Sequence, residues 1–204
     1  TYTVTATNGT TSCVNSMTGT AVVSINSLPT AFAVTGGGNY CIGGTGVNIG
    51  LDGSNTGTSY QLYNGAVAVG AAVPGSTGSP INFGAQTALG IYTVVANTTA
   101  TTCTGNMSGS ATVGVNPLPA VYSVTGGGNY CTGGAGVHVG LAGSNTGVQY
   151  QLMNGTSPVG GALTGTGRAL DFGLQTAAGV YSVAAMNIAT GCTATMSGSV
   201  TIAI

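Results

Sequence analysis

The stretch Thr35-Gly36-Gly37-Gly38-Asn39-Tyr40-Cys41 occurs a second time, residue for residue, at positions 125–131. Residues 60–65 (YQLYNG) recur as residues 150–155 with one exchange, and both pairs are offset by 90. Residues 107–110 (MSGS) recur as 196–199, offset by 89, so one residue is lost in between. A period near 90 is too long for a solenoid unit and is the size of one small β-sandwich.

The same alignment places the start of the chain within a repeat, because Tyr2, Cys13 and Met17 correspond to Tyr92, Cys103 and Met107. We therefore expect three parts. Residues 1–27 are the C-terminal hairpin of a preceding repeat, and residues 28–117 and 118–204 are two complete repeats. An isolated hairpin is marginally stable in water. We expect residues 1–27 to dock on the next domain or on a neighbouring chain.

Short runs rich in Thr, Val, Ile and Tyr alternate with Gly, Asn and Pro, which is typical of strands separated by turns. No helical periodicity lasts two turns. The fold class we predict is all-β, with tandem immunoglobulin-like antiparallel β-sandwich domains. In the first complete repeat we expect strands at 31–35, 46–51, 58–63, 66–73, 80–83, 91–97 and 107–115, with the second repeat following about 90 residues later.

Four tyrosines are candidate structural residues. Tyr92 and Tyr181 each follow Gly-x at the start of the sixth strand, like the tyrosine corner of immunoglobulin-like folds, whose hydroxyl bonds to nearby backbone. Tyr60 and Tyr150 lie in the third strand, where such domains bury a large aromatic side chain.

The chain of 204 residues carries three formal charges, and charged residues make up 1% of it. Nucleic-acid binding needs a basic surface, and acid–base catalysis and calcium binding need clustered titratable groups. We therefore expect no enzymatic activity, no cofactor, no metal site and no nucleic-acid partner. No apolar run approaches the length of a membrane span, so we expect no membrane insertion.

The few titratable side chains are not shared between the repeats. Asp52 aligns with Ala142, His138 with Asn48, Asp171 with Asn82, and Arg168 with Ser79. A site used by every repeat cannot depend on them, so we interpret them as surface variation. Arg168 and Asp171 are close enough in sequence for a local ion pair, which is worth little at a surface.

Five cysteines occupy two repeat positions. Cys41 and Cys131 precede the second strand, whereas Cys13, Cys103 and Cys192 lie in the last hairpin loop. Recurrence at fixed positions in a small β domain favours disulfides and hence an oxidising, extracellular compartment.

Two disulfide pairings compete. The simpler one lies within each domain, Cys41–Cys103 and Cys131–Cys192, and we lean slightly toward it. Against it, the two loops belong to opposite ends of an immunoglobulin-like sandwich, roughly 20 Å apart, whereas bonded cysteines need Cα atoms within about 7 Å. The alternative is an interdomain bond, Cys41–Cys192. In both cases Cys13 has its partner outside the chain.

The repeated elements, from Tyr-Cys-x-Gly-Gly to Gly-x-Tyr-x-Val and Met-Ser-Gly-Ser, resemble the tandem repeats of giant surface adhesins from gliding Bacteroidetes-type bacteria. The resemblance implies an immunoglobulin-like fold, export to the cell surface and a long filamentous stalk. It implies neighbouring repeats or copies of the same chain as partners, with surface polysaccharide as a further candidate.

We therefore expect a structural segment of an extracellular filament or adhesin stalk that mediates surface attachment or gliding. The alternative is a carbohydrate- or ice-binding β-sandwich module. That alternative requires a flat face with threonine at every second position on adjacent strands. Residues 1–7 (TYTVTAT) have this spacing, but residues 92–95 and 181–183 do not.

Overall fold

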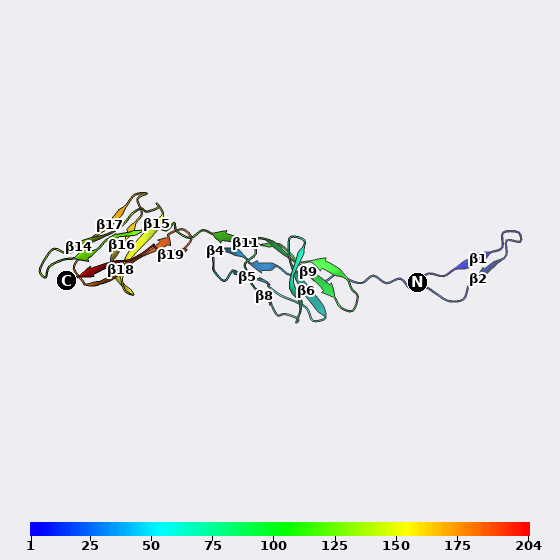
Figure 1. Ribbon diagram of the computed structural model, residues 1–204. Helices are drawn as coiled ribbons and strands as arrows, with labels where there is room; N and C mark the ends of the chain where they lie inside the picture. The colour runs from blue at the N-terminus through cyan, green and yellow to red at the C-terminus, as the bar shows by residue number, and fades with distance from the viewer. The chain divides into compact units, whose positions relative to one another are not determined.

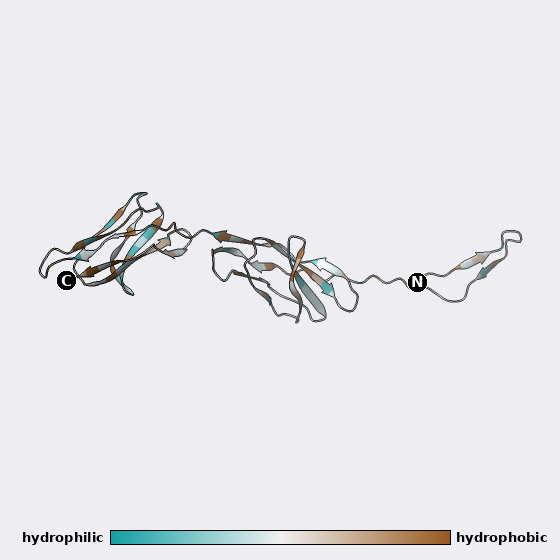
Figure 2. Cartoon of the chain, viewed as in Figure 1, coloured by the Kyte–Doolittle hydropathy of each residue, from teal (hydrophilic) through white to brown (hydrophobic).

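The computed structural model describes residues 1–204, and its regular structure consists of strands alone (Figure 1). None of its segments is a helix that could cross a membrane. Hydrophobic and hydrophilic residues are mixed along the strands (Figure 2), and in the longer strands buried residues alternate with more exposed ones. This alternation puts one face of each strand toward a core and the other toward solvent. The predicted all-β class is confirmed.

Each complete repeat has nine strands rather than the seven expected. In the first repeat they are β3 (Val34–Gly36), β4 (Gly38–Cys41), β5 (Val47–Leu51), β6 (Thr58–Asn64), β7 (Val67–Pro74), β8 (Ile81–Gln86), β9 (Gly90–Thr98), β10 (Thr104–Asn106) and β11 (Ala111–Asn116).

The second repeat has the same series. Its strands are β12 (Val124–Gly126), β13 (Gly128–Asn129), β14 (Val137–Leu141), β15 (Val148–Asn154), β16 (Ser157–Thr164), β17 (Leu170–Gln175), β18 (Gly179–Asn187), β19 (Thr193–Thr195) and β20 (Val200–Ala203).

Two sheets form in each repeat. The smaller has the order β3-β5-β8, and the larger has the order β4-β11-β9-β6-β7 with β10 added to β9. In the second repeat the orders are β12-β14-β17 and β13-β20-β18-β15-β16, with β19 added to β18. Strand β4 runs parallel to β11, and the other registered pairs of this repeat are antiparallel. This two-sheet arrangement is an immunoglobulin-like β-sandwich.

The core of the second repeat draws on both of its sheets. Val139 and Leu141 come from the smaller sheet, and Tyr150, Val183 and Ile202 from the larger one. All five side chains are at most 1% exposed. Burial of apolar surface between the two sheets supplies the main driving force for this fold.

The sequence prediction missed two strands of the first repeat, β4 and β10, and their equivalents in the second. Strand β4 falls in a glycine-rich segment, where the composition favours a turn over a strand. Where one strand was predicted, at 107–115, the structure has β10 ending at Asn106 and β11 beginning at Ala111. The residues between them, which include Met107 and Ser108, belong to neither strand. The strand expected at 31–35 begins later, at Val34.

Glycine has a specific role where the chain turns into β5 and β14. Gly46 has a φ of +84° and Gly136 a φ of +88°. A Cβ atom at Gly46 would lie 2.3 Å from the carbonyl oxygen of Gln86, and one at Gly136 would lie 2.5 Å from that of Gln175. Only glycine fits this backbone angle and close approach.

Residues 1–27 form a separate small hairpin, in which β1 (Thr5–Thr7) pairs antiparallel with β2 (Val14–Ser16). A single bridge between Tyr2 and Ala21 extends this pairing. Every residue from 1 to 28 is exposed. The expected docking of the hairpin on the next domain or on a neighbouring chain stays a prediction.

Backbone proximity divides the chain into two compact units. One comprises Thr1–Gly36, Ile49–Gly84 and Ile91–Ala111, and the other comprises Gly37–Asn48, Ala85–Gly90 and Thr112–Ile204. Strand β4 therefore belongs to the same unit as the whole of the second repeat. The domain boundaries at 27/28 and 117/118 follow the sequence repeat and stay a prediction.

Candidate functional site

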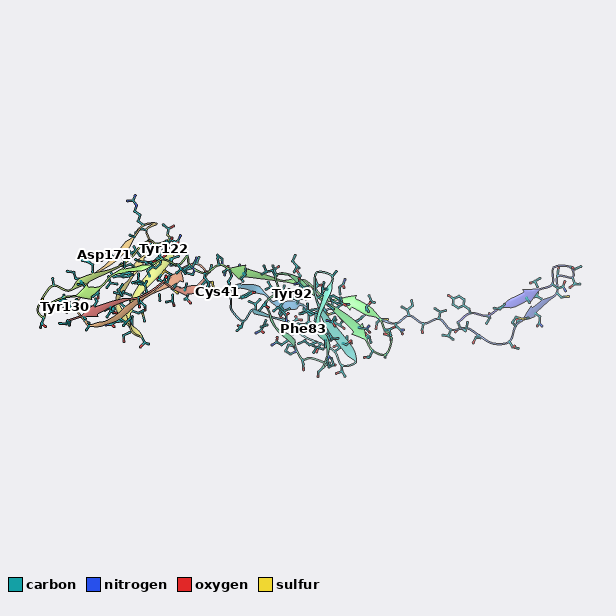
Figure 3. The ribbon with its side chains drawn as sticks, viewed as in Figure 1. Cys41, Phe83, Tyr92, Tyr122, Tyr130 and Asp171 are labelled. Atoms are coloured by element: carbon teal, nitrogen blue, oxygen red, sulfur yellow. A yellow bond between two sulfur atoms is a disulfide. The ribbon has the colours of Figure 1, made fainter.

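The disulfide of this chain joins Cys41 to Cys192, whose Cα atoms are 5.6 Å apart. Cys41 is the last residue of β4 (Figure 3), where its register partner is Asn116 at the end of β11. The next residue, Ile42, donates its N–H to the carbonyl oxygen of Asn116 at 3.1 Å, and the Cys41 carbonyl accepts from the Gly44 N–H at 2.8 Å. These bonds fix Cys41 at the edge where the strand ends.

Cys192 lies in the loop between β18 and β19 and is fully buried. Its carbonyl accepts the Asn187 N–H at 2.8 Å. The Asn187 side chain in turn accepts the N–H groups of Ala189 and Thr190 at 3.0 and 3.2 Å. This Asx-type turn sets the direction in which the loop presents the Cys192 sulfur.

The within-domain pairing, Cys41–Cys103 with Cys131–Cys192, is wrong. Cys131 follows β13, which pairs with the end of β20, and that end of β20 pairs with Gly179. Cys192 lies beside Asn187, with which its backbone is hydrogen-bonded. Gly179 and Asn187 are the two ends of β18. A strand of that length separates the two cysteines by roughly 25 Å, too far for one bond. The structure contains the other pairing, and it connects the two sequence repeats.

Cys13, Cys103 and Cys131 are free thiols, of which Cys13 and Cys131 are exposed and Cys103 is half-buried. Their backbones resemble those of the bonded cysteines. The Cys131 carbonyl accepts from Gly134 at 2.8 Å, as Cys41 does from Gly44. The Cys103 carbonyl accepts the Thr98 N–H at 3.0 Å, as the Cys192 carbonyl accepts the Asn187 N–H.

The four tyrosines predicted as structural are all buried, with exposed fractions of 0 or 1% (Figure 3 labels Tyr92). The Tyr60 hydroxyl accepts the Asn55 N–H at 2.9 Å, and the Tyr150 hydroxyl accepts the Asn145 N–H at the same distance. The Tyr181 hydroxyl donates to the carbonyl of Ala177, four residues upstream, at 2.8 Å. That bond is the one expected of a tyrosine corner.

Sequence reasoning missed one repeated polar feature, the buried serines Ser54 and Ser144. The Ser54 hydroxyl has two carbonyl acceptors for its one proton, Ser79 at 2.7 Å and Ser76 at 2.9 Å, and it accepts the Ser76 N–H. Ser144 donates to the carbonyl of Arg168. Both serines occupy the same position of the repeat, within GSNTG, and this recurrence could have identified them from the sequence. These hydrogen bonds stabilise a loop in each repeat.

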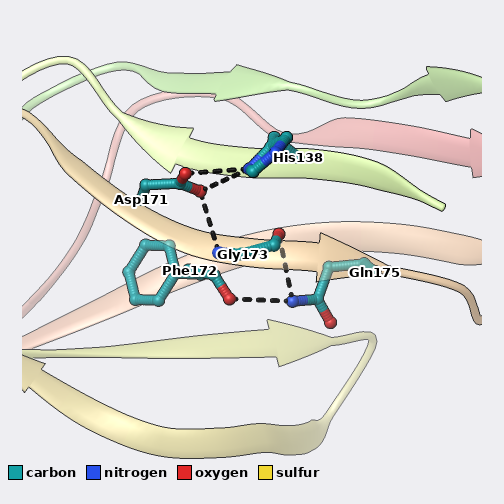
Figure 4. Close-up of polar contacts among 5 residues, drawn as sticks. All are labelled: His138, Asp171, Phe172, Gly173 and Gln175. Carbon is teal, nitrogen blue, oxygen red and sulfur yellow. Dashed lines mark hydrogen bonds and ion pairs between the residues drawn. The ribbon is translucent and has the colours of Figure 1, made fainter. Parts of the chain in front are cut away.

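Asp171 pairs with His138 and not with Arg168, the partner that its place in the sequence allowed (Figure 4). Nδ1 of His138 lies 2.8 Å from Oδ2 of Asp171, and Oδ1 accepts the Gly173 N–H at 2.8 Å. A bulge between His138 and Gly140 shifts the register of β14 on β17 and brings the two side chains together. The His138 hydrogen bond, followed by that from Gly173, lowers the pKa of Asp171.

The remaining charged side chains have local roles. Oδ1 of Asp52 accepts the Ala33 N–H at 2.8 Å, which ties β3 to the end of β5. Arg168 is exposed. No three His, Cys, Asp or Glu side chains gather where they could hold a metal ion.

No protein-family model matches the chain, and no curated protein matches its sequence. Among solved structures, fibronectin(III)-like modules of Clostridium thermocellum CbhA align at 14% identity with a TM-score of 0.45, covering 84% of this chain and 93% of that one. The human OSCAR ligand-binding domain aligns at 13% identity with a TM-score of 0.35, covering 87% of this chain and 96% of that one. A cytokine receptor complex aligns at 18% identity with a TM-score of 0.27, covering 74% of this chain and 81% of that one. At these values the likeness adds nothing to the fold described above.

The outer faces of the strands do not repeat the threonine spacing of residues 1–7. The positions of Thr3, Thr5 and Thr7 are taken by Thr93, Val95 and Asn97 in the first repeat. In the second repeat they are taken by Ser182, Ala184 and Met186. A shallow hollow of about 270 Å³ lies beside Gln149, Gln151 and Met186, and no charged side chain lines it.

Proposed function

We propose that this chain is a structural segment of an extracellular filament or adhesin stalk, built from tandem immunoglobulin-like repeats, that mediates surface attachment or gliding. The observation that carries the proposal is the Cys41–Cys192 bond. It connects a strand of one sequence repeat to a loop of the next, so tension applied to one repeat reaches the other through a covalent bond.

The positions of the free cysteines support the same role. Cys131 occupies the repeat position of Cys41, and Cys103 and Cys13 occupy that of Cys192. In an array each of them has a partner of the complementary kind in an adjacent repeat. Cys131 bonds the loop cysteine of the following repeat, and Cys103 and Cys13 each bond the β4-type cysteine of a preceding one.

Composition also supports a stalk. With one basic and two acidic residues, stacked domains do not repel one another, and their association is insensitive to salt. The connection between the repeats contains Pro117 and Pro119, and proline stiffens a short linker. A disulfide indicates an oxidising compartment, which supports the extracellular, cell-surface location.

Electron microscopy of the native assembly, labelled with antibody against the full chain, tests the proposal. We expect extracellular fibres decorated at regular intervals. Peptide mapping of the same material should find Cys131 bonded to a cysteine of the Cys13, Cys103 or Cys192 position in another repeat. Label inside the cell, or fibres whose Cys131 is bonded to another Cys131, would contradict it.

Glycan binding separates the proposal from the carbohydrate-binding alternative. The oxidised full chain is applied to an array of polysaccharides. The stalk role predicts no selective binding by the two repeats themselves. Saturable binding of one glycan that is lost on exchange of Gln149 and Gln151 would support the alternative instead.

A further inference from the structure

We propose that the apolar face of the 1–23 hairpin is a docking site for the first six strands of an immunoglobulin-like repeat, a segment with the strand pattern of residues 28–89. Each of the two complete repeats contains such a segment, β3–β8 or β12–β17, packed on its own last hairpin. In the 1–23 hairpin the residues equivalent to those packed positions are all exposed. The proposal rests on the internal repeat and not on the filament role.

The backbone of the hairpin is already that of the last hairpin in a complete repeat. Its register pairs Ala6 with Asn15, as β9 and β10 pair Ala96 with Gly105. The Met17 N–H donates to the Val4 carbonyl at 2.8 Å. The corresponding bonds, from Met107 to Val94 and from Met196 to Val183, have the same length.

One face of the hairpin carries the apolar side chains that are buried in the core of a complete repeat, and here these side chains are exposed. Tyr2 is 65% exposed, whereas its equivalents Tyr92 and Tyr181 are 0% and 1% exposed. Val4 is 65% exposed against 1% for Val94 and 0% for Val183. The six apolar residues of this face, all exposed here and buried at the same positions of the first repeat, are Tyr2, Val4, Ala6, Met17, Ala21 and Val23.

The face is also hollowed. Tyr2, Val4, Met17 and residues 18–21 line a depression of about 330 Å³. In the complete repeats the methionine equivalent to Met17 is in contact with the segment just before the smaller sheet. The backbone nitrogen of Phe32 lies 3.4 Å from the sulfur of Met107, and that of Tyr122 lies 3.4 Å from the sulfur of Met196.

The free edge of the hairpin specifies how the segment joins it. In the first repeat Ser108 donates its N–H to the Phe32 carbonyl and accepts the Val34 N–H, both at 2.8 Å, in a parallel bridge. The second repeat has the same pair of bonds at Ser197. The equivalent residue of the hairpin is Thr18. An aromatic-x-Val strand placed parallel to Thr18 satisfies its N–H and its carbonyl.

The other edge specifies a second strand. In the first repeat β6 (TSYQLYN) pairs antiparallel along β9, from Thr58 opposite Thr98 to Asn64 opposite Tyr92. In the second repeat β15 (VQYQLMN) pairs along β18 in the same register. Residues 2–8 of the hairpin offer the same edge. The occupant is therefore recognised by two strands, aromatic-x-Val and Tyr-Gln-Leu-x-Asn, and no segment of residues 28–204 is left over to supply them.

The test fuses residues 28–90 directly ahead of Thr1 in the full chain, and in a second version residues 118–179. Hydrogen exchange by mass spectrometry follows the amides of residues 2–23. We expect exchange to slow by about 100-fold or more in the fused chain. In the unfused chain these amides exchange at nearly the rate of an open hairpin.

Paired substitutions in the fused chain provide the control. Val4→Asp, on the apolar face, should abolish the added protection, and Thr3→Asp, on the opposite face, should preserve it. Unchanged exchange in both fused versions, or equal effects of the two substitutions, would overturn the proposal. So would concentration-dependent dimerisation of the unfused chain through its hairpin faces, since a second copy would then be the occupant.

Discussion

Cys41 and Cys192 are bonded to each other across a sequence separation of 151 residues. Almost the whole of both complete repeats lies inside this covalent loop. Only residues 1–40 and 193–204 lie outside it. The loop therefore determines how much of the chain can lengthen when its two ends are pulled.

We predict that force spectroscopy on the oxidised chain, held at its termini, shows no lengthening from residues 42–191. Cys41→Ser should release this hidden length, about 500 Å at roughly 3.4 Å per extended residue. Cys131→Ser is the matched control, because that thiol is free, and it should behave as the unmodified protein. Equal extension of all three proteins would show that the bond carries no load.

A second prediction concerns the buried hydroxyl of Tyr60, the acceptor for the Asn55 N–H. Tyr60→Phe leaves this half-buried N–H without a partner, which costs about 1–3 kcal/mol. Denaturant unfolding of the full chain measures the change. Tyr63→Phe on the same strand, where the side chain is only half-buried, should cost less. Equal costs would mean that the hydrogen bond is not the source of stability.

The third prediction concerns Gly136, where the left-handed φ and the nearby Gln175 carbonyl both exclude a Cβ atom. Gly136→Ala should destabilise the chain by about 1–3 kcal/mol. Gly161→Ala is the control, because a Cβ there has no atom within 4 Å and φ is not positive. It should be neutral or slightly stabilising in thermal unfolding. A neutral Gly136→Ala would show that the turn can relax.

The fourth prediction is a pH dependence centred on Asp171. Its pKa is lowered from the ordinary 3.8 by the bonds from His138 and Gly173. The ionised form is therefore favoured in the folded chain. The stabilisation is fully present above pH 3.8 and is lost as the pH falls through the lowered, folded-state pKa. Because the pair is exposed, we expect less than about 1 kcal/mol.

Two substitutions separate charge from hydrogen bonding at Asp171. Asp171→Asn should remove this pH dependence while keeping the acceptor for Gly173, since Asn82 accepts the Gly84 N–H at 2.8 Å in the first repeat. Asp171→Ala should lose both. Acid titration of unfolding, followed by circular dichroism, provides the measurement. An unchanged pH profile in Asp171→Asn would assign the dependence to another group.

Local pattern was sufficient to predict the longer strands and the buried tyrosines. In β6 and β9 every second residue over the middle of the strand is buried, and Tyr60 and Tyr92 are among these core-facing residues. Strand β4 has no such alternation. It exists because its backbone pairs with β11, and a pairing between distant segments leaves little trace in the local sequence.

The sites depended on three-dimensional facts that the repeat alignment does not contain. Cys41 had two equivalent candidate partners in sequence, Cys103 and Cys192, and the structure bonds it to Cys192 and leaves Cys103 free. His138 and Asp171 are 33 residues apart, and the bulge in β14 brings them together. Arg168 was closer to Asp171 in sequence, but an exposed side chain in a turn has little to hold it there.

The single basic residue of the chain has a consequence for degradation. A protease that cuts after lysine or arginine finds one site, Arg168, in an exposed turn. Because Arg168 lies inside the covalent loop closed by Cys41 and Cys192, cleavage there opens the ring but leaves the two fragments joined. The nicked molecule separates only when it is also reduced, so in an oxidising environment one cut does not sever it.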